Sequence, residues 1–103
     1  MTSRLEMVLE LVAEHPGEPM PRYMAGNELL GAGDFAGAVA HLRRYIEMLP
    51  EGDVGAAYRL LARAHRALGD EPAARESFAE GIRAALAHGH RDLAEAIRGE
   101  IEG

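Results

Sequence analysis

Apolar side chains recur every three or four residues along most of the chain, the spacing that places them on one face of an α-helix. Proline and glycine interrupt this pattern, as at Pro16-Gly17 and at Pro50. No stretch shows the strict apolar and polar alternation of a half-buried strand. The pattern therefore predicts an all-α chain with six helices, at about residues 3–14, 20–32, 34–49, 53–68, 70–88 and 90–101.

Residues that cap helices stand at several of the predicted starts. Ser3 and Glu6 match the S-x-x-E capping box, in which the serine oxygen accepts a hydrogen bond from a free backbone N–H. Asp34, Asp53 and Asp70 hold the corresponding place before three later helices. These caps support the helix starts that the apolar spacing predicts.

Each predicted helix has an apolar face that we expect to be buried against its neighbours. In five helices these residues are Leu5, Val8, Leu9 and Val12; Phe35, Val39, Leu42, Ile46 and Leu49; Ala57, Leu61, Ala64 and Leu68; Phe78, Ile82 and Leu86; and Leu93, Ala94, Ile97 and Ile101. The opposite face of the last helix carries Arg91, Glu95, Arg98 and Glu102. A charged outer face is typical of the terminal unit of a repeat protein.

The helix ends themselves recur at a nearly constant distance. Gly33-Asp34 ends one helix and opens the next, and Gly69-Asp70 repeats this device 36 residues later. Pro16 and Pro50, which both interrupt a helix, are 34 residues apart. A period of this size, built from pairs of helices, predicts a solenoid of helical hairpins.

Within this frame the chain carries a degenerate form of a known repeat motif. A tetratricopeptide repeat opens with W-x-x-L-G-x-x-Y and continues with A-x-x-x-F and a closing proline. The matching residues are Ala25-Gly26, Leu29, Ala38, Leu42 and Pro50 in the first repeat, and Tyr58, Leu61-Ala62, Ala74 and Phe78 in the second. Arg22 and His65 depart from the motif, since each stands where an aromatic residue is usual. The chain resembles the tetratricopeptide repeat (TPR) family, as a small bacterial-type member.

The resemblance implies a single domain over residues 1–103. Its parts would be a leading helix at 1–16, repeats at 17–52 and 53–88, and a closing helix at 89–103. Small residues would let the two helices of a pair approach closely, namely Gly26, Ala38, Ala62 and Ala74. Gly81 costs about 1 kcal/mol in helix propensity at its mid-helix position, and we expect a close approach of the closing helix to be the reason.

Composition narrows the possible functions. The 103 residues are 48% hydrophobic and 27% charged, which is typical of one globular domain. The absence of cysteine excludes a disulfide framework and fits a reducing compartment. A net charge of −6 argues against non-specific binding to nucleic acid or to an anionic membrane. Acidic residues interrupt the N-terminal helix, so we expect no signal peptide and a cytoplasmic location.

Five histidines raise the possibility of a metal or acid–base site, but only His88 and His90 are close in sequence. They stand at a predicted helix end, and no third ligand has a suitable spacing. We expect His65 to pack between helices with a hydrogen bond from its ring, and His15 and His41 to lie on the surface. No catalytic arrangement is marked by its spacing, so we expect no enzyme, no metal and no cofactor.

One basic stripe remains. Arg59, Arg63 and Arg66 fall on one face of the fourth predicted helix, because they are spaced by four and three residues. The equivalent positions 36 residues earlier hold Tyr23, Asn27 and Leu30. The TPR resemblance implies that these faces line a concave groove that takes a peptide. With such a groove, the chain would be an adaptor that binds another protein or a peptide. The bound segment would carry acidic side chains or a free C-terminal carboxylate, which the arginines can pair with. An ordinary solvated face explains the three arginines equally well.

The first predicted helix has more apolar residues than one contact needs. Met7 and Leu11 widen its apolar face, and exposed apolar residues of this kind mark contact sites. They favour a weak homodimer through the N-terminal helix, and a self-associating structural or chaperone-like protein is the second candidate function. In the alternative, the helix curls into the concave side and covers Met7 and Leu11 itself.

Overall fold

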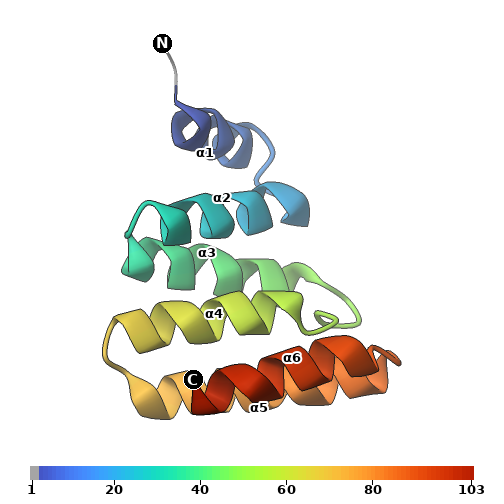
Figure 1. Cartoon of the computed structure of the whole chain (residues 1–103). Coiled ribbons are helices and arrows are strands. Elements are labelled where there is room, and N and C mark those ends of the chain that lie inside the picture. The colour runs from blue at the N-terminus through green and yellow to red at the C-terminus, as the bar shows by residue number, and fades with distance from the viewer. Residues whose placement is uncertain (1–2) are drawn as a thin grey trace.

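The computed structural model describes residues 3–103 (Figure 1). Within this range the secondary structure consists of α-helices joined by turns and loops: α1 (Arg4–Glu14), α2 (Pro19–Gly31), α3 (Phe35–Met48), α4 (Ala56–Ala67), α5 (Glu71–Ala87) and α6 (Arg91–Glu102). The all-α class and the six helices that the sequence predicts are thus confirmed. None of the helices in residues 3–103 combines the length and the apolar character that crossing a membrane requires.

The helices stack in chain order, each reversing the direction of the one before, from α1 at one end to α5 and α6 at the other (Figure 1). α2 packs on α3 and α4 packs on α5, as the two helices of a hairpin do. α2 also touches α4, and α6 lies along α5. The first helices of successive hairpins therefore lie beside one another, which is the arrangement of a helical-hairpin solenoid.

The capping residues perform as the sequence predicts at three helix starts. Ser3 Oγ accepts from Glu6 N at 3.1 Å, Asp34 Oδ1 from Gly37 N at 2.9 Å, and Asp70 Oδ1 from Ala73 N at 3.2 Å. Gly33 and Gly69 directly follow the C-caps of the preceding helices, and their φ angles of 84° and 80° are favourable only for glycine. Because these signals are local, the 36-residue repeat of helix stop and helix start is visible in the sequence.

The start of α4 differs from the prediction. Asp53 is buried and its Oδ2 accepts from Gly55 N at 2.8 Å and from Ala57 N at 2.9 Å, but the helix begins only at Ala56. The backbone turns at Gly55, where φ is 122°. A β-carbon at Gly55 would also lie 2.9 Å from the carbonyl oxygen of Gly81. Asp53 therefore caps α4 from outside the helix, across a turn that only glycine can form.

Close helix packing follows the small residues of the repeat motif. A β-carbon placed on Gly26 would lie 2.6 Å from Leu42 Cγ, so the α2 and α3 backbones approach as closely as glycine allows. Leu42 and Phe78 are completely buried. At Gly81 an added β-carbon would meet Ile97 Cδ1 of α6 and Tyr58 Cβ of α4, each at 3.2 Å. The expected close approach of the last helix to Gly81 is confirmed.

Three residues assigned to inward faces are exposed instead, and those assignments were wrong. Leu9 is 37% exposed, Leu68 51% and Leu86 51%. Leu9 lies at the flank of α1, whose main contact within the described residues is with α2. Leu68 is the C-cap of α4, and Leu86 lies in the last turn of α5, where the chain turns away from its neighbours. Spacing along a helix predicts a face, but not where the neighbouring helix ends.

Candidate functional site

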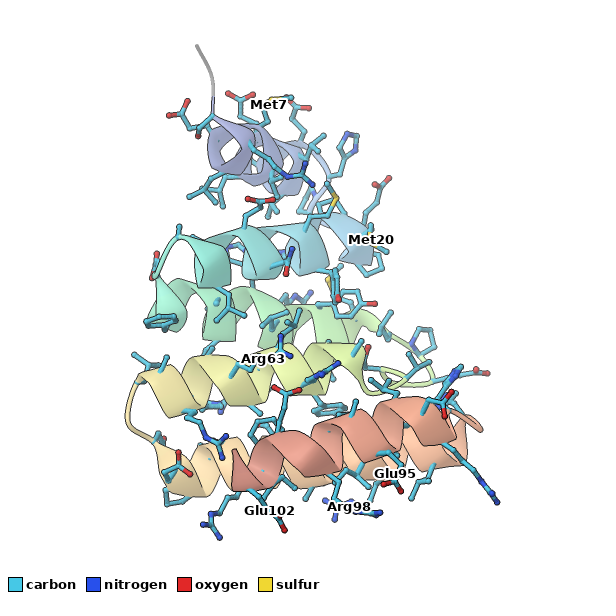
Figure 2. The ribbon with its side chains drawn as sticks, viewed as in Figure 1. Met7, Met20, Arg63, Glu95, Arg98 and Glu102 are labelled. Carbon is cyan, nitrogen blue, oxygen red and sulfur yellow. The ribbon has the colours of Figure 1, made fainter. Side chains whose placement is uncertain are left out.

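The arginine stripe of α4 meets a carboxylate of α6. Arg59 Nε donates to Glu100 Oε2, Arg63 Nε donates to Glu100 Oε1 at 2.6 Å, and Arg63 Nη2 donates to Oε2 at 3.1 Å. The Glu100 side chain is only 23% exposed, whereas that of Arg63, which is labelled on α4 in Figure 2, is 42% exposed. Two neighbouring turns of α4 thus present guanidinium groups to one carboxylate.

Arg66 completes the contact by binding the end of α6. Its Nη1 donates to the carbonyl of Glu100 at 2.7 Å and its Nη2 to that of Ile101 at 3.1 Å. The last carbonyls of a helix have no partner within the helix, so these bonds act as a C-terminal cap. Arg66 also donates to Glu71 at 3.0 Å and lies over the Phe78 ring, 4.9 Å from its centroid.

The pairing fixes the charge of this cluster. Burial raises the pKa of Glu100, but hydrogen bonds from Arg63 and Arg59 outweigh burial and hold that pKa below its usual range. The hydrogen bond to Glu100 likewise raises the pKa of Arg63. Glu100 is therefore an anion at neutral pH. It neutralises part of the basic stripe and joins α6 to α4.

A shallow cleft of about 450 Å³ lies beside this ion pair. Its walls are Arg63, Arg66, Ala67, Phe78, Gly99, Glu100 and Gly103. Both terminal nitrogens of Arg59 and the Nη1 of Arg63 have no hydrogen-bond partner within residues 3–103. The site can therefore still donate to a further anion. Another cleft, of about 490 Å³ at the turn between α5 and α6, contains none of the predicted groove residues.

The α2 half of the predicted groove is separate from the arginine cluster. Tyr23 is half-buried and its ring tilts at 57° against that of Tyr45, with the centroids 5.1 Å apart. Leu30 is half-buried beside the core, and Asn27 is exposed. No hydrogen bond or ion pair within residues 3–103 joins these three residues to the arginines. The two halves are connected through packing, because α2 touches α4 and α3 packs against both helices.

Glu100 is the site residue that the sequence reasoning missed. The apolar spacing assigns Leu93, Ala94, Ile97 and Ile101 to the inner face of α6, and it leaves Glu100 without a role. A signal was nevertheless present. Like charges spaced by four residues on a helix repel one another, so an acidic residue on a neighbouring helix stabilises them, and α6 repeats the position of α4 in the next hairpin.

The outer side of α1 carries the two residues predicted for self-association. Val8 and Val12 are buried in a cluster with Ala25 of α2. Met7 is 55% exposed and Leu11 is 37% exposed, and Figure 2 shows Met7 on the side of α1 turned away from α2. The helix therefore does not curl in to cover these side chains, and they remain available for contact.

The histidines divide into buried and exposed residues. His65 is buried as expected, but its ring makes no hydrogen bond within residues 3–103. Burial, followed by the charge of Arg43, lowers the pKa of His65. His41 is half-buried, not on the surface as expected, and its Nδ1 is buried without a partner. Burial and the charge of Arg22 lower its pKa as well. Both imidazoles are thus neutral at pH 7.

The remaining three histidines lie at helix ends; His15 is the C-cap of α1 and is exposed, as expected. His88 is the C-cap of α5, and its Nδ1 lies 2.9 Å from the carbonyl oxygen of Ala84. His90 precedes α6 and is exposed. Across residues 3–103 no group of three His, Asp or Glu side chains is placed to hold a metal ion. A helix end is the structural role of this pair.

These features define the class of protein, a helical repeat protein built from stacked helical hairpins. Small residues lie where the helices of a hairpin meet, and a polar cluster joins α4 to α6. The sequence matches no family model. It is 31% identical over 87 residues to the TPR repeat-containing protein PA0015 of Pseudomonas aeruginosa, and the match covers 84% of this chain and 81% of that protein. The chain therefore belongs to the tetratricopeptide repeat family, as the resemblance in its sequence predicts.

A solved structure has the same fold. The solution structure of protein BPP2914 from Bordetella parapertussis superposes with a TM-score of 0.83 over 99% of this chain and 87% of that one. Because the two are only 20% identical, the likeness shows the fold alone. Together, family and fold indicate a helical repeat protein.

Proposed function

We propose that this protein is a non-catalytic adaptor of the cytoplasm that binds a carboxylate-bearing peptide along the face shared by α2 and α4. The observation that carries the proposal is the convergence of Arg59 and Arg63 on the carboxylate of Glu100. Guanidinium groups in this arrangement are preorganised for an anion, because each offers donors in a planar fork. The same cluster can hold a carboxylate supplied by a partner.

The ligand binds through the donors that Glu100 leaves free. These are the terminal nitrogens of Arg59 and the Nη1 of Arg63. Asn27, which is exposed, can bind the peptide backbone, and the half-buried Tyr23 and Leu30 offer apolar surface to a neighbouring side chain. A peptide with an acidic residue or its own C-terminal carboxylate fits this combination of groups.

Binding of this kind is weak and depends on salt. Exposed ion pairs contribute only about 0.2–1 kcal/mol each. Glu100 already neutralises part of the arginine charge, so a ligand meets less than the full charge of three guanidinium groups. The attraction between exposed charges is screened over about 10 Å at 0.1 M salt, so affinity falls as salt rises.

The test starts with affinity capture from the source cell and then measures how the captured partner binds two matched variants. Arg63→Gln removes a guanidinium from the cluster, while Arg83→Gln removes one from α5, where Arg83 forms an ion pair with Glu80 of the same helix. We expect Arg63→Gln to weaken binding of the partner about fivefold, because this is the effect of losing one exposed ion pair. We expect Arg83→Gln to leave binding unchanged. Equal effects of the two substitutions, or equal binding in high salt, would refute the proposal.

A second variant separates binding from folding, since Arg63 also holds α6 in place. Glu100→Gln removes the competing carboxylate and keeps all three guanidinium groups. The proposal requires this variant, while folded, to bind the captured partner more tightly than the wild type does. Weaker binding would mean that Glu100 itself belongs to the recognition surface.

Self-association through α1 is the second candidate function, and the exposure of Met7 and Leu11 favours it.

A further inference from the structure

The outer side of α1 carries a stripe with the spacing of a helix–helix contact. Arg4, Met7, Leu11 and Glu14 follow one another at intervals of three, four and three residues, which places them in one line along the helix. We call these four residues the α1 seam. All four are exposed, with 55% of Met7 and 37% of Leu11 accessible. The seam has an apolar centre and a charge of opposite sign at each end.

The internal repeat shows that the centre of the seam is a packing position. Pro16 and Pro50 set an offset of 34 residues between α1 and α3, so Met7 corresponds to His41 and Leu11 to Tyr45. In α3 these positions face α2, the other helix of the hairpin. Tyr45 packs on Tyr23, and His41 is half-buried. No helix within residues 3–103 occupies that place on α1. Within residues 3–103, the α1 seam is thus a hairpin contact face without a partner helix.

We propose that α1 of a second copy of this protein occupies the seam, running antiparallel to the first. When Met7 lies opposite Leu11 of the second copy, Arg4 lies opposite Glu14 of that copy, and the reverse holds by two-fold symmetry. The apolar centre is then covered on both sides, and each guanidinium meets a carboxylate. A parallel pair would instead place Arg4 against Arg4 and Glu14 against Glu14.

The outer face of α6, at the other end of the stack of helices, is not suited to pack on the α1 seam of another copy. Glu95, Arg98 and Glu102 lie on the far side of α6, where they face away from the rest of the molecule (Figure 2). A head-to-tail stack of α1 on α6 would place Met7 and Leu11 against these charges. The two-fold arrangement avoids that cost and closes the assembly at two copies.

Two features keep the association weak. The seam spans only the 11 residues of α1, so the area that it can bury is far smaller than the area buried in a stable dimer. Glu10 lies on the same flank of both helices, so two like charges approach each other across the interface. Arg4 also pairs with Glu28 of its own chain and would have to hold both carboxylates, for which a guanidinium has enough donors.

Cross-linking tests the register directly, because the chain contains no cysteine. Two singly substituted chains, Met7→Cys and Leu11→Cys, are mixed under mild oxidation and compared with each alone. The antiparallel seam predicts that disulfides form mainly between unlike chains. Disulfides mainly between like chains would overturn the register, and a chain that is monomeric by sedimentation at the highest attainable concentration would overturn the dimer.

Charge reversal tests the pairing at the ends of the seam. We expect Arg4→Glu or Glu14→Arg alone to weaken dimerisation about tenfold, because symmetry breaks two ion pairs at once. The double substitution Arg4→Glu with Glu14→Arg should restore it. Arg98→Glu on the far face of α6 is the control and should change nothing. If the double variant is as weak as the single ones while all remain helical, Arg4 and Glu14 do not pair across the interface.

Discussion

Replacing Glu100 by glutamine removes the negative charge at the meeting point of α4 and α6 and leaves the size of the side chain unchanged. In the wild type this carboxylate accepts from Arg59 Nε and from two nitrogens of Arg63. A glutamine offers one oxygen as acceptor, and its amide nitrogen would face a guanidinium that also only donates. The substitution therefore weakens every side-chain bond of residue 100 at once.

The expected loss of stability follows from the exposure of these groups. Hydrogen bonds to charged groups contribute about 1.5–3 kcal/mol when buried, whereas exposed ion pairs contribute about 0.2–1 kcal/mol. The Glu100 side chain is 23% exposed, but those of Arg59 and Arg63 are 30% and 42% exposed, so water screens part of the attraction. We expect Glu100→Gln to lower the free energy of unfolding by about 1–2 kcal/mol. In a domain of this size that corresponds to a fall in Tm of roughly 5–10 °C.

Thermal and urea unfolding, followed by circular dichroism, measure this difference. Glu95→Gln is the matched control, because Glu95 lies on the same helix and pairs with Arg98 at 3.0 Å, but with a side chain that is 70% exposed. We expect the control to change stability by less than about 0.5 kcal/mol. Equal stability of Glu100→Gln and the wild type at pH 7 would show that the bonds from Arg59 and Arg63 to the Glu100 carboxylate make no net contribution to stability.

The pH dependence separates charge from packing. The pKa of Glu100 is lowered in the folded state, so its contribution is present above the unfolded value of 4.5 and is lost as pH falls through the folded pKa. The stability curves of the wild type and of Glu100→Gln should therefore converge in acid. A difference that persists undiminished well below pH 4 would mean that glutamine disturbs packing and that the charge is not the cause.

Two further predictions concern the core. Gly26→Ala should lower the free energy of unfolding by about 1–3 kcal/mol, because the added β-carbon would lie 2.6 Å from Leu42 Cγ. Gly31→Ala is the control and should not destabilise the protein, because the space around Gly31 is open. A Gly26→Ala protein as stable as the wild type in urea unfolding would contradict the close packing of α2 on α3. Burial and the charge of Arg43 lower the pKa of His65, so the free energy of unfolding should decline as pH falls below 6.5 toward the pKa of the folded state. His65→Gln should make this decline less steep. If the slope of unfolding free energy against pH is the same in the variant and the wild type, His65 is not its source.

Most of the fold follows from local signals. Ser3, Asp34 and Asp70 cap their helices through residues three positions away, so sequence order alone reveals them. The turn before α4 escaped the prediction because Gly55 adopts its φ of 122° beside the carbonyl oxygen of Gly81, a contact between distant parts of the chain. Helix identity is thus local, while some helix boundaries are set by tertiary contacts.

The candidate site was only half predictable for the same reason. Helical spacing places Arg59, Arg63 and Arg66 on one face, because that depends on α4 alone. Their partner Glu100 lies 41 residues after Arg59, and its position depends on how far α6 extends along α4. A solvated face and a peptide groove were the interpretations open to the sequence. The structure adds a contact within the chain, which neither of them included.

That internal contact links the stability of the protein to the proposed binding of a peptide. Arg59 and Arg63 have a limited number of donors, and Glu100 takes three of them. A ligand carboxylate that bound the same nitrogens would have to displace the Glu100 side chain, and it would weaken the contact between α6 and α4, although Arg66 would still bind the last carbonyls of α6. A ligand that used only the free nitrogens would leave α6 in place. If the ligand displaces Glu100, then Glu100→Gln lowers stability and raises affinity, whereas a ligand on the free nitrogens gains only from the removal of a nearby negative charge. The ratio of the two effects in one variant therefore tells which nitrogens the partner uses.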